Sequence, residues 1–368
     1  MVPPGAIVFP ADGDINSLPD QPAVYMIVPC EGDPYLGRTN VLRRRIRRMF
    51  EKWNLAGHTD RVEYWPTASK LEQWLYSYTL ARRHFPQTWT RMVKLPRVAY
   101  VKLILHNQFP RTQITTRLSG HPAVFYGPFP SRGAADPFEA QFLELFQLRR
   151  CQEDLAPSPD HPGCIYGEMR MCLRPCQEAV SADEYASEAA RVAEFLERRG
   201  ASLLDVAAAA REQSSADLDF EEAKRQHQRY QKVEAIIRSG GDLARSIDAL
   251  HGVAVLPAAR PDEVMLWFFH SGGWLDPCAF SIAPGIPEPM DKRLRALVAG
   301  VNTPALSLAA RQDHLALLAK WYFSSWRDGE WVVIDRWDSI PYRRLVNAIS
   351  RVSTAGKRQG SQAGELPQ

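Results

Sequence analysis

Four of the six cysteines in this chain lie between residues 151 and 176, and their thiolates could hold a metal. Twelve residues separate Cys151 from Cys164, seven separate Cys164 from Cys172, and three separate Cys172 from Cys176. Prolines and glycines are frequent between them, which indicates a loop-rich segment in which thiolates can converge. Such a set binds either Zn²⁺ or an iron–sulfur cluster. None of the spacings is the short Cys-x-x-Cys of common zinc ribbons, so spacing leaves the metal open.

The alternatives to a metal site are disulfides and four unrelated buried cysteines. Disulfides persist in oxidising compartments, and nothing in this sequence suggests export. The N-terminus lacks the basic region followed by an apolar one that marks a signal peptide. No apolar run approaches the roughly 18 residues of a membrane span. We therefore expect a cytoplasmic protein with no membrane contact.

Two tyrosines on a predicted hairpin, with arginines after it, form a second candidate site. Apolar runs at residues 23–28 and 34–37, separated by Gly32-Asp33, predict two paired strands that carry Tyr25 and Tyr35. The next helix is predicted from an apolar stripe at helical spacing, which comprises Leu42, Ile46, Met49 and Phe50. Arginines cover its other faces: Arg43, Arg44, Arg45, Arg47 and Arg48.

Arg38 and Arg45 are seven residues apart, close to two helical turns, so we expect both guanidinium groups to face one anion. The simpler interpretation is that the two tyrosines only pack and the arginines form a solvated surface. The net charge of +3 is unevenly distributed, with 20 basic against 12 acidic residues in 1–150. This basic part favours a polyanionic partner, although charge that serves solubility would give the same count.

Several segments in the middle of the chain, taken in order, resemble the UvrC family, the excinucleases of bacterial nucleotide excision repair. The segments that carry the resemblance are Phe125–Pro130, Leu145–Cys151, Gly163–Tyr166 and Met171–Cys176. The resemblance implies that the four cysteines bind a [4Fe–4S] cluster, with zinc as the alternative. It also implies DNA as a ligand and a place in a DNA-repair complex.

Val24-Tyr25 and Tyr35-Leu36-Gly37 resemble the motif of the GIY-YIG nuclease domain. The resemblance implies that Tyr25, Tyr35, Arg38 (usually lysine in that family) and Arg45 form the catalytic positions. It implies DNA contacts for the remaining arginines of the helix: Arg43, Arg44, Arg47 and Arg48.

The next helix begins with Ser69 and Glu72 in a capping box, and the family's metal-binding glutamate falls on Ser77. Glu72 lies about 140° away around the helix and cannot replace it. A hydroxyl is a poor substitute for a carboxylate on a hard dication. We therefore expect a degenerate nuclease site that binds DNA without cutting. If another carboxylate replaces the glutamate, the chain is instead a Mg²⁺- or Mn²⁺-dependent endonuclease that makes the 3′-side incision.

The run from Leu218 to Arg225 resembles the UVR motif, a helical hairpin that binds UvrB. The residues that carry the resemblance, and that we expect to contact a UvrB-like partner, are Leu218, Phe220, Glu221, Ala223 and Arg225. The hairpin makes a pure interaction module a third hypothesis. An ordinary antiparallel helix pair with a solvated face is the simpler interpretation.

The predicted fold class is a multidomain α+β protein. Its expected parts are a GIY-YIG-type α/β domain, a cysteine-cluster region, a UVR helical hairpin and a small, degenerate RNase H-like α+β domain. The predicted boundaries are 1–20 for a loose lead-in, 21–95 for the nuclease-like domain, 96–180 for linker strands and cysteines, 181–238 for the helical region, 245–352 for the last domain and 353–368 for a disordered tail.

Overall fold

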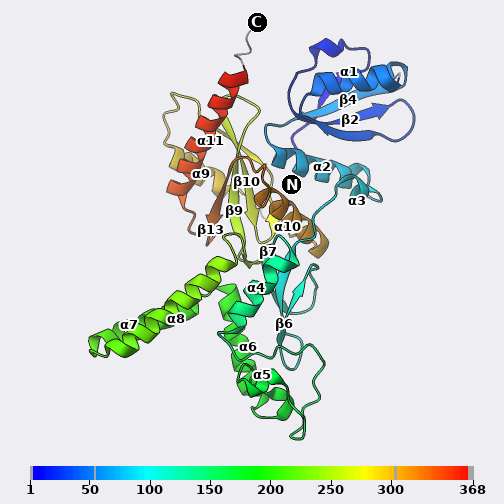
Figure 1. Ribbon diagram of the computed structural model, residues 1–368. Helices are drawn as coiled ribbons and strands as arrows, with labels where there is room; N and C mark the ends of the chain where they lie inside the picture. The colour runs from blue at the N-terminus through cyan, green and yellow to red at the C-terminus, as the bar shows by residue number, and fades with distance from the viewer. Residues whose placement is uncertain (1–2, 54, 302–304, 364–368) are drawn as a thin grey trace. The chain divides into compact units, whose positions relative to one another are not determined.

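The computed structural model describes residues 3–53, 55–301 and 305–363 (Figure 1). Within them the protein is α+β, as predicted, and its strands form three antiparallel sheets. The chain divides into two compact units. The first comprises Met1–Leu95, His251–Ala305 and Lys320–Gln368, and the second comprises Pro96–Leu250 and Leu306–Ala319.

The N-terminal sheet of the first unit has the strand order β1-β4-β2-β3. Its strands are β1 (Ile7–Pro10), β2 (Ala23–Pro29), β3 (Tyr35–Thr39) and β4 (Thr59–Pro66). The predicted hairpin is confirmed, and its register pairs Tyr25 with Gly37 and Ile27 with Tyr35. The expectation of a loose lead-in is wrong for β1, because all four of its residues pair with β4.

Helices α1 (Leu42–Trp53) and α2 (Lys70–His84) lie on opposite sides of this sheet (Figure 1). Successive side chains of a strand point to opposite faces. Tyr25 and Ile27 accordingly share one core with the buried stripe of α1, whose members are those predicted: Leu42, Ile46, Met49 and Phe50. We call this side the α1 face and the other the α2 face.

Helix α2 begins with the predicted capping box. Ser69 accepts a hydrogen bond from the Glu72 backbone, and Glu72 accepts one from the Ser69 backbone. Most of the α2 side chains are buried, including polar ones on successive turns. A helix with buried residues all round must be covered on more than one side.

The second sheet of the first unit has the order β11-β10-β9-β13, with β12 also paired to β10. Its strands are β9 (His251–Pro257), β10 (Glu263–His270), β11 (Gly273–Trp274), β12 (Cys278–Ser281) and β13 (Glu330–Ile334). Helices α9 (Met290–Ala299) and α11 (Tyr342–Ala363) close its core. The expected disordered tail is wrong for residues 353–363, which continue α11; residues 364–368 lie outside the described residues.

The second unit contains the sheet β6-β5-β7-β8. Its strands are β5 (Ala99–Ile104), β6 (Arg111–Thr115), β7 (Ala123–Phe129) and β8 (Arg245–Ser246). Helices α4 (Arg132–Leu143), α6 (Ala182–Glu197) and α8 (Phe220–Ser239) pack with it in one hydrophobic core. The boundary predicted at 180 therefore does not separate two cores.

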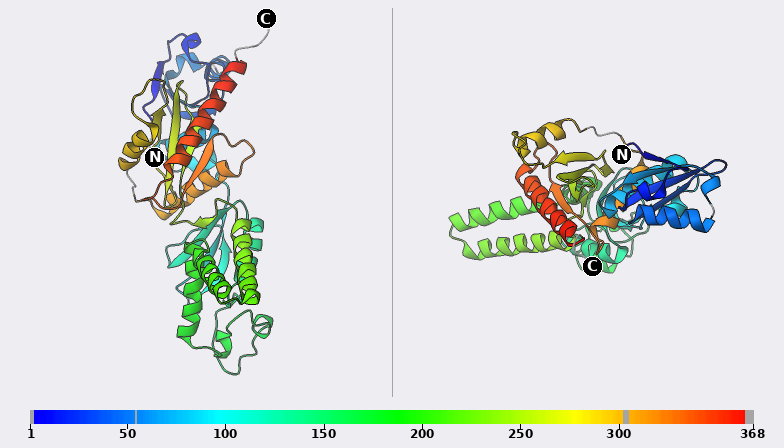
Figure 2. Two further views of the ribbon diagram at one scale, coloured as in Figure 1. Left: turned by 90° about the vertical axis from the view of Figure 1, so that its left-hand side faces the viewer. Right: turned by 90° about the horizontal axis from the view of Figure 1, so that it is seen from above.

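Four further helices and three 3₁₀ turns complete the described chain. The helices are α3 (Trp89–Met92), α5 (Ile165–Glu168), α7 (Ala201–Ala216) and α10 (Leu308–Tyr322), and the turns are Ile15–Ser17, Leu55–Gly57 and Pro175–Gln177. Helices α7 and α8 lie side by side as a hairpin that projects from its unit (Figures 1 and 2). None of the helices in the described residues is both long and apolar enough to cross a bilayer.

Candidate functional site

Two tyrosines and one arginine meet on the α1 face, and we call them the tyrosine–arginine site. The ring centroids of Tyr25 and Tyr35 are 6.2 Å apart. Arg45 Nε donates to the Tyr25 hydroxyl at 3.0 Å, and that hydroxyl donates to Met49 Sδ at 3.3 Å. Tyr25 is fully buried, Arg45 is half-buried, and Tyr35 is 43% exposed. Three of the predicted site residues therefore come together, and two of them can meet a ligand from solvent.

Gly37 allows the Tyr25 ring to lie against β3. A Cβ atom at position 37 would stand 2.5 Å from the Tyr25 hydroxyl oxygen, which is closer than real atoms approach. Burial raises the pKa of Tyr25, although the hydrogen bond from Arg45 opposes that shift. The same hydrogen bond raises the pKa of Arg45. The site thus holds a permanent positive charge beside a neutral phenol, a pair suited to a phosphate oxygen.

Arg38 does not join this site, which corrects our expectation that it faces one anion together with Arg45. Residue 38 follows Gly37 on β3, so its side chain leaves the strand on the α2 face. There its guanidinium carbon lies 3.5 Å from the ring centroid of Trp74, and Lys320 Nζ lies 3.1 Å from the same centroid. Burial, with the charge of Arg38, lowers the pKa of Lys320 to about 8. Arg38 therefore packs on an indole that another cation also contacts.

The four remaining arginines of α1 divide into two pairs. Arg43 Nε donates to the Leu18 carbonyl at 2.6 Å, and Arg47 Nη2 donates to Asn16 Oδ1 at 2.5 Å. These two attach the N-terminal 3₁₀ turn to α1. Arg44 and Arg48 are one turn apart and exposed, so their side chains face solvent.

Two positions on α2, Ser77 and Glu72, were considered for a metal-binding carboxylate. Neither supplies one to the tyrosine–arginine site. Ser77, which stands at the position of the expected metal-binding glutamate, is buried. Glu72 Oε2 accepts hydrogen bonds from Ala68 N at 2.9 Å and Ser69 N at 3.2 Å. Burial raises the pKa of Glu72 to about 7 in spite of these bonds. Glu72 is therefore engaged in the helix cap, and both residues belong to the helix on the α2 face.

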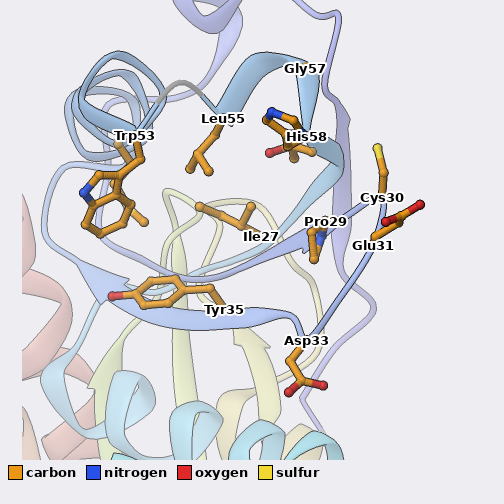
Figure 3. Close-up of a pocket in the computed structure, with 12 residues that line it drawn as sticks. Ile27, Pro29, Cys30, Glu31, Asp33, Tyr35, Trp53, Leu55, Gly57 and His58 are labelled. Carbon is orange, nitrogen blue, oxygen red and sulfur yellow. The ribbon is translucent and has the colours of Figure 1, made fainter.

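A cavity of about 530 Å³ opens beside Tyr35 on the α1 face (Figure 3). Its apolar wall is formed by Ile27, Met49 and Leu55, and its rim includes Cys30, Glu31, Asp33 and His58. Trp53 also lines it, is 50% exposed, and meets Tyr35 edge-on with ring centroids 6.4 Å apart. Sequence reasoning missed this cavity. The spacing of Arg45, Met49 and Trp53, each four residues on, could have placed Trp53 on the same side of α1.

The four predicted cysteine ligands lie near one another in the second unit. Burial, together with smaller contributions from the nearby thiols of Cys151, Cys164 and Cys176, raises the pKa of Cys172 to about 11. Backbone N–H of Arg174 donates to Cys172 Sγ at 3.3 Å, and Arg149 Nη1 lies 3.5 Å from Cys151 Sγ.

The donor chemistry of these cysteines fits a thiolate-bound metal group, which N–H donors around the sulfurs would stabilise. As the side chains stand, however, no three His, Cys, Asp or Glu residues in the described parts of the chain are placed to hold one metal ion. A polynuclear cluster separates its cysteine sulfurs more widely than a single tetrahedral ion does.

The hairpin of α7 and α8 presents apolar side chains at its tip. Leu218 and Phe220 are 72% and 68% exposed, and they lie at the turn between the two helices. Glu222 forms an ion pair with Arg225, which is also exposed. Val233 and Ile236, further along α8, are buried in the core of the unit. The base of the hairpin is thus fixed, while the tip offers apolar surface to a partner.

Comparison with known proteins places the second unit in a family. Residues 98–195, which contain all four clustered cysteines, match the family of the UvrC/Cho excinuclease middle domain. The chain therefore contains a middle domain of the UvrC family. The match begins just before β5 and ends within α6, so it covers three of the four strands of the sheet, the cysteine loops and most of α6.

Similarity to curated members of the UvrC family extends beyond the middle domain. UvrABC system protein C of Dehalococcoides mccartyi is 24% identical over 267 residues, or 70% of this chain and 44% of the relative. The protein of the same name from Moorella thermoacetica is 27% identical over 265 residues, covering 70% and 43%. That from Acetivibrio thermocellus is 24% identical over 298 residues, covering 78% and 47%. This chain therefore spans less than half the length of these relatives. No solved structure matches it.

Proposed function

We propose that this UvrC-family chain is a DNA-binding protein of nucleotide excision repair whose GIY-YIG-type site holds phosphate without cutting it. One observation carries the proposal: Arg45 and Tyr35 are accessible on the α1 face, whereas the position for a metal-binding carboxylate holds the buried Ser77 on α2. The phosphate ligands would be Arg45 and the exposed Arg44 and Arg48.

The lack of cutting follows from the chemistry of phosphodiester hydrolysis. A divalent ion neutralises the charge that develops on the phosphate and activates the attacking water. Removing one such electrostatic contribution typically costs about 3–4 kcal/mol of transition-state stabilisation. Tyr25 cannot replace the ion as a base, because its raised pKa keeps the phenol protonated and its hydroxyl already contacts Arg45 and Met49.

Salt dependence of binding tests the phosphate contacts. Three arginine–phosphate contacts predict that the logarithm of affinity for duplex DNA falls with the logarithm of salt with a slope of about −2.7. Arg45→Ala should make the slope shallower by about one unit. Fluorescence anisotropy with a labelled duplex measures both. An affinity that does not change between about 50 and 200 mM salt would overturn the proposal.

A second candidate function is a metal-dependent endonuclease, and Glu31 and Asp33 favour it. Both carboxylates line the cavity that Tyr35 also lines, so a cation held there would lie near the tyrosine–arginine site. Nicking of supercoiled plasmid in Mg²⁺ or Mn²⁺ that disappears in the double variant E31Q/D33N would establish this function. A plasmid that stays intact in both metals would exclude it.

We further propose that Cys151, Cys164, Cys172 and Cys176 hold a [4Fe–4S] cluster. Support comes from the mutual nearness of the four thiols and from the N–H donors beside Cys172 and Cys151. The cluster would tie the cysteine loops to one another. Anaerobically purified protein should be brown, absorb at the blue end of the visible range and contain about four irons. Colourless protein with one zinc would show that the alternative is correct.

The α7–α8 hairpin is the proposed contact with a UvrB-like protein. Its support is the exposure of Leu218 and Phe220 at the tip, since monomeric proteins seldom leave large apolar side chains adjacent and exposed without a use. Phe220→Ala should weaken capture of UvrB. Val206→Ala is the control, because Val206 is another exposed apolar residue on the hairpin. Equal capture by all three proteins would exclude this contact.

A further inference from the structure

We propose that the cavity beside Tyr35 is a pocket for one unpaired nucleobase of the bound DNA strand. The proposal rests on the proposed DNA-binding function and adds the substrate class: DNA with an extruded or single-stranded nucleotide. Three features carry it, namely the position of the cavity, its aromatic walls and the chemistry of its rim.

The cavity adjoins the tyrosine–arginine site. Tyr35 belongs to both, and Met49 lines the cavity while accepting the hydrogen bond from Tyr25. Along α1, Arg45, Met49 and Trp53 succeed one another at intervals of four residues and so share one side of the helix. A phosphate held by Arg45 would therefore lie at one end of this row, with the cavity at the other. A nucleotide joins an anionic phosphate to a flat apolar base in the same order.

The size and the walls of the cavity suit a nucleoside. Its volume of about 530 Å³ is within the roughly 300–1,000 Å³ of pockets that bind small organic ligands. Tyr35 and Trp53 are both about half exposed at its edge, with an angle of 75° between their ring planes (Figure 3). Each has a ring face on which a base could stack, and Ile27 and Leu55 complete an apolar floor. Stacking of a base on an aromatic side chain is largely independent of sequence.

The rim of the cavity excludes phosphate and favours particular bases. Glu31 and Asp33 are exposed carboxylates on the turn that leads into β3. They repel the DNA backbone, which keeps phosphates on the arginine side of the row. A carboxylate accepts hydrogen bonds from exocyclic amino groups of bases. Guanine, adenine and cytosine carry such a group and thymine does not, so thymine should be the weakest occupant.

A duplex with a single bulged nucleotide tests the pocket with the full chain. The probes are one duplex sequence with a bulged G, A, C or T, and the same duplex with an abasic bulge. We expect the duplexes with G, A and C bulges to bind about tenfold more tightly than the duplex with the abasic bulge. The affinity for the T bulge should lie between these two levels. Trp53→Ala should bring the affinity for the bulged bases down to that for the abasic duplex, and Trp53→Phe should restore most of the difference.

Phe323→Ala is the matched control, because Phe323 is another exposed aromatic residue, 42% accessible and absent from the cavity lining. It should leave the preference for bases intact. Equal binding of bulged and abasic duplexes, together with a normal salt slope, would overturn the base pocket and leave the DNA-binding function standing. Binding that Arg45→Ala does not weaken, or no binding, would overturn both.

Discussion

Each face of the N-terminal sheet brings an arginine to an aromatic side chain, but the two faces use that contact in different ways. On the α1 face, Arg45 bonds to the hydroxyl of Tyr25, and the neighbouring Tyr35 remains exposed. On the α2 face, Arg38 stacks on Trp74, whose ring also contacts Lys320. The first arrangement leaves a cation available to an anion from solvent. The second uses the cation to hold packed elements together. What an arginine does therefore depends on what covers the face that it points to.

The largest expected change in stability comes from removing the indole on the α2 face. Trp74→Ala should lower the free energy of unfolding by about 3 kcal/mol, because it leaves Arg38 and Lys320 facing each other across an empty space. Trp53→Ala on the α1 face is the control and should cost less than about 1 kcal/mol, since half of that side chain is already exposed. Urea denaturation measures both. Equal losses would show that the two faces are not packed differently.

The pH dependence of stability tests the burial of the α2 face. Burial raises the pKa of Glu72 from 4.5 to about 7. Between these two pH values the folded chain therefore keeps a proton on Glu72 that the unfolded chain has released. Stability contributed by this group is therefore complete below pH 4.5 and is lost as the pH rises through 7. The loss amounts to about 3 kcal/mol. Glu72→Gln, which keeps a capping-box side chain, should flatten this part of the profile.

Glu184→Gln provides a matched control for Glu72→Gln. Glu184 occupies the same place in the capping box of α6, but it is exposed and its hydrogen bonds with Ser181 lower its pKa. Its contribution should therefore change in the opposite direction, with stability lost as the pH falls below 4.5. If denaturation at about pH 5 and pH 8 gives parallel profiles for wild type and Glu72→Gln, the carboxyl is not buried as described.

A smaller effect separates the two arginines themselves. Arg45→Ala should weaken binding to duplex DNA by about tenfold at low salt, which corresponds to about 1.4 kcal/mol, because it removes a charged phosphate ligand. Arg38→Ala should leave that affinity unchanged and reduce only stability, by about 1 kcal/mol. Anisotropy and denaturation on the same two variants distinguish these outcomes. A loss of affinity in Arg38→Ala as large as in Arg45→Ala would place both arginines on the DNA.

Local sequence patterns predicted the elements of this sheet well. The α1 stripe was predictable because each apolar residue faces the core one turn after the last, and the α2 cap because Ser69 and Glu72 bond to each other's backbone. Strand β1 was missed because its partner, β4, lies about fifty residues further along the chain. Pairing at that distance leaves no local pattern in the sequence.

The sequence identified most residues of the candidate site but did not predict how they are arranged. Tyr25, Tyr35 and Arg45 meet as the motif suggests, but Arg38 was misplaced because helical spacing was applied across a strand-to-helix junction. On β3, a shift of one residue from Gly37 changes the face. The cavity could not be predicted in full, because it combines the end of α1, the turn before β3 and the start of β4.

Binding without cutting can be measured by incubating the full chain with supercoiled plasmid in Mg²⁺ or Mn²⁺, at a salt concentration where a mobility shift confirms binding. We expect plasmid that is bound and remains closed, with the shift weakened in Arg45→Ala. Nicked plasmid, with nicking lost in Arg45→Ala and in Tyr25→Phe, would contradict this expectation.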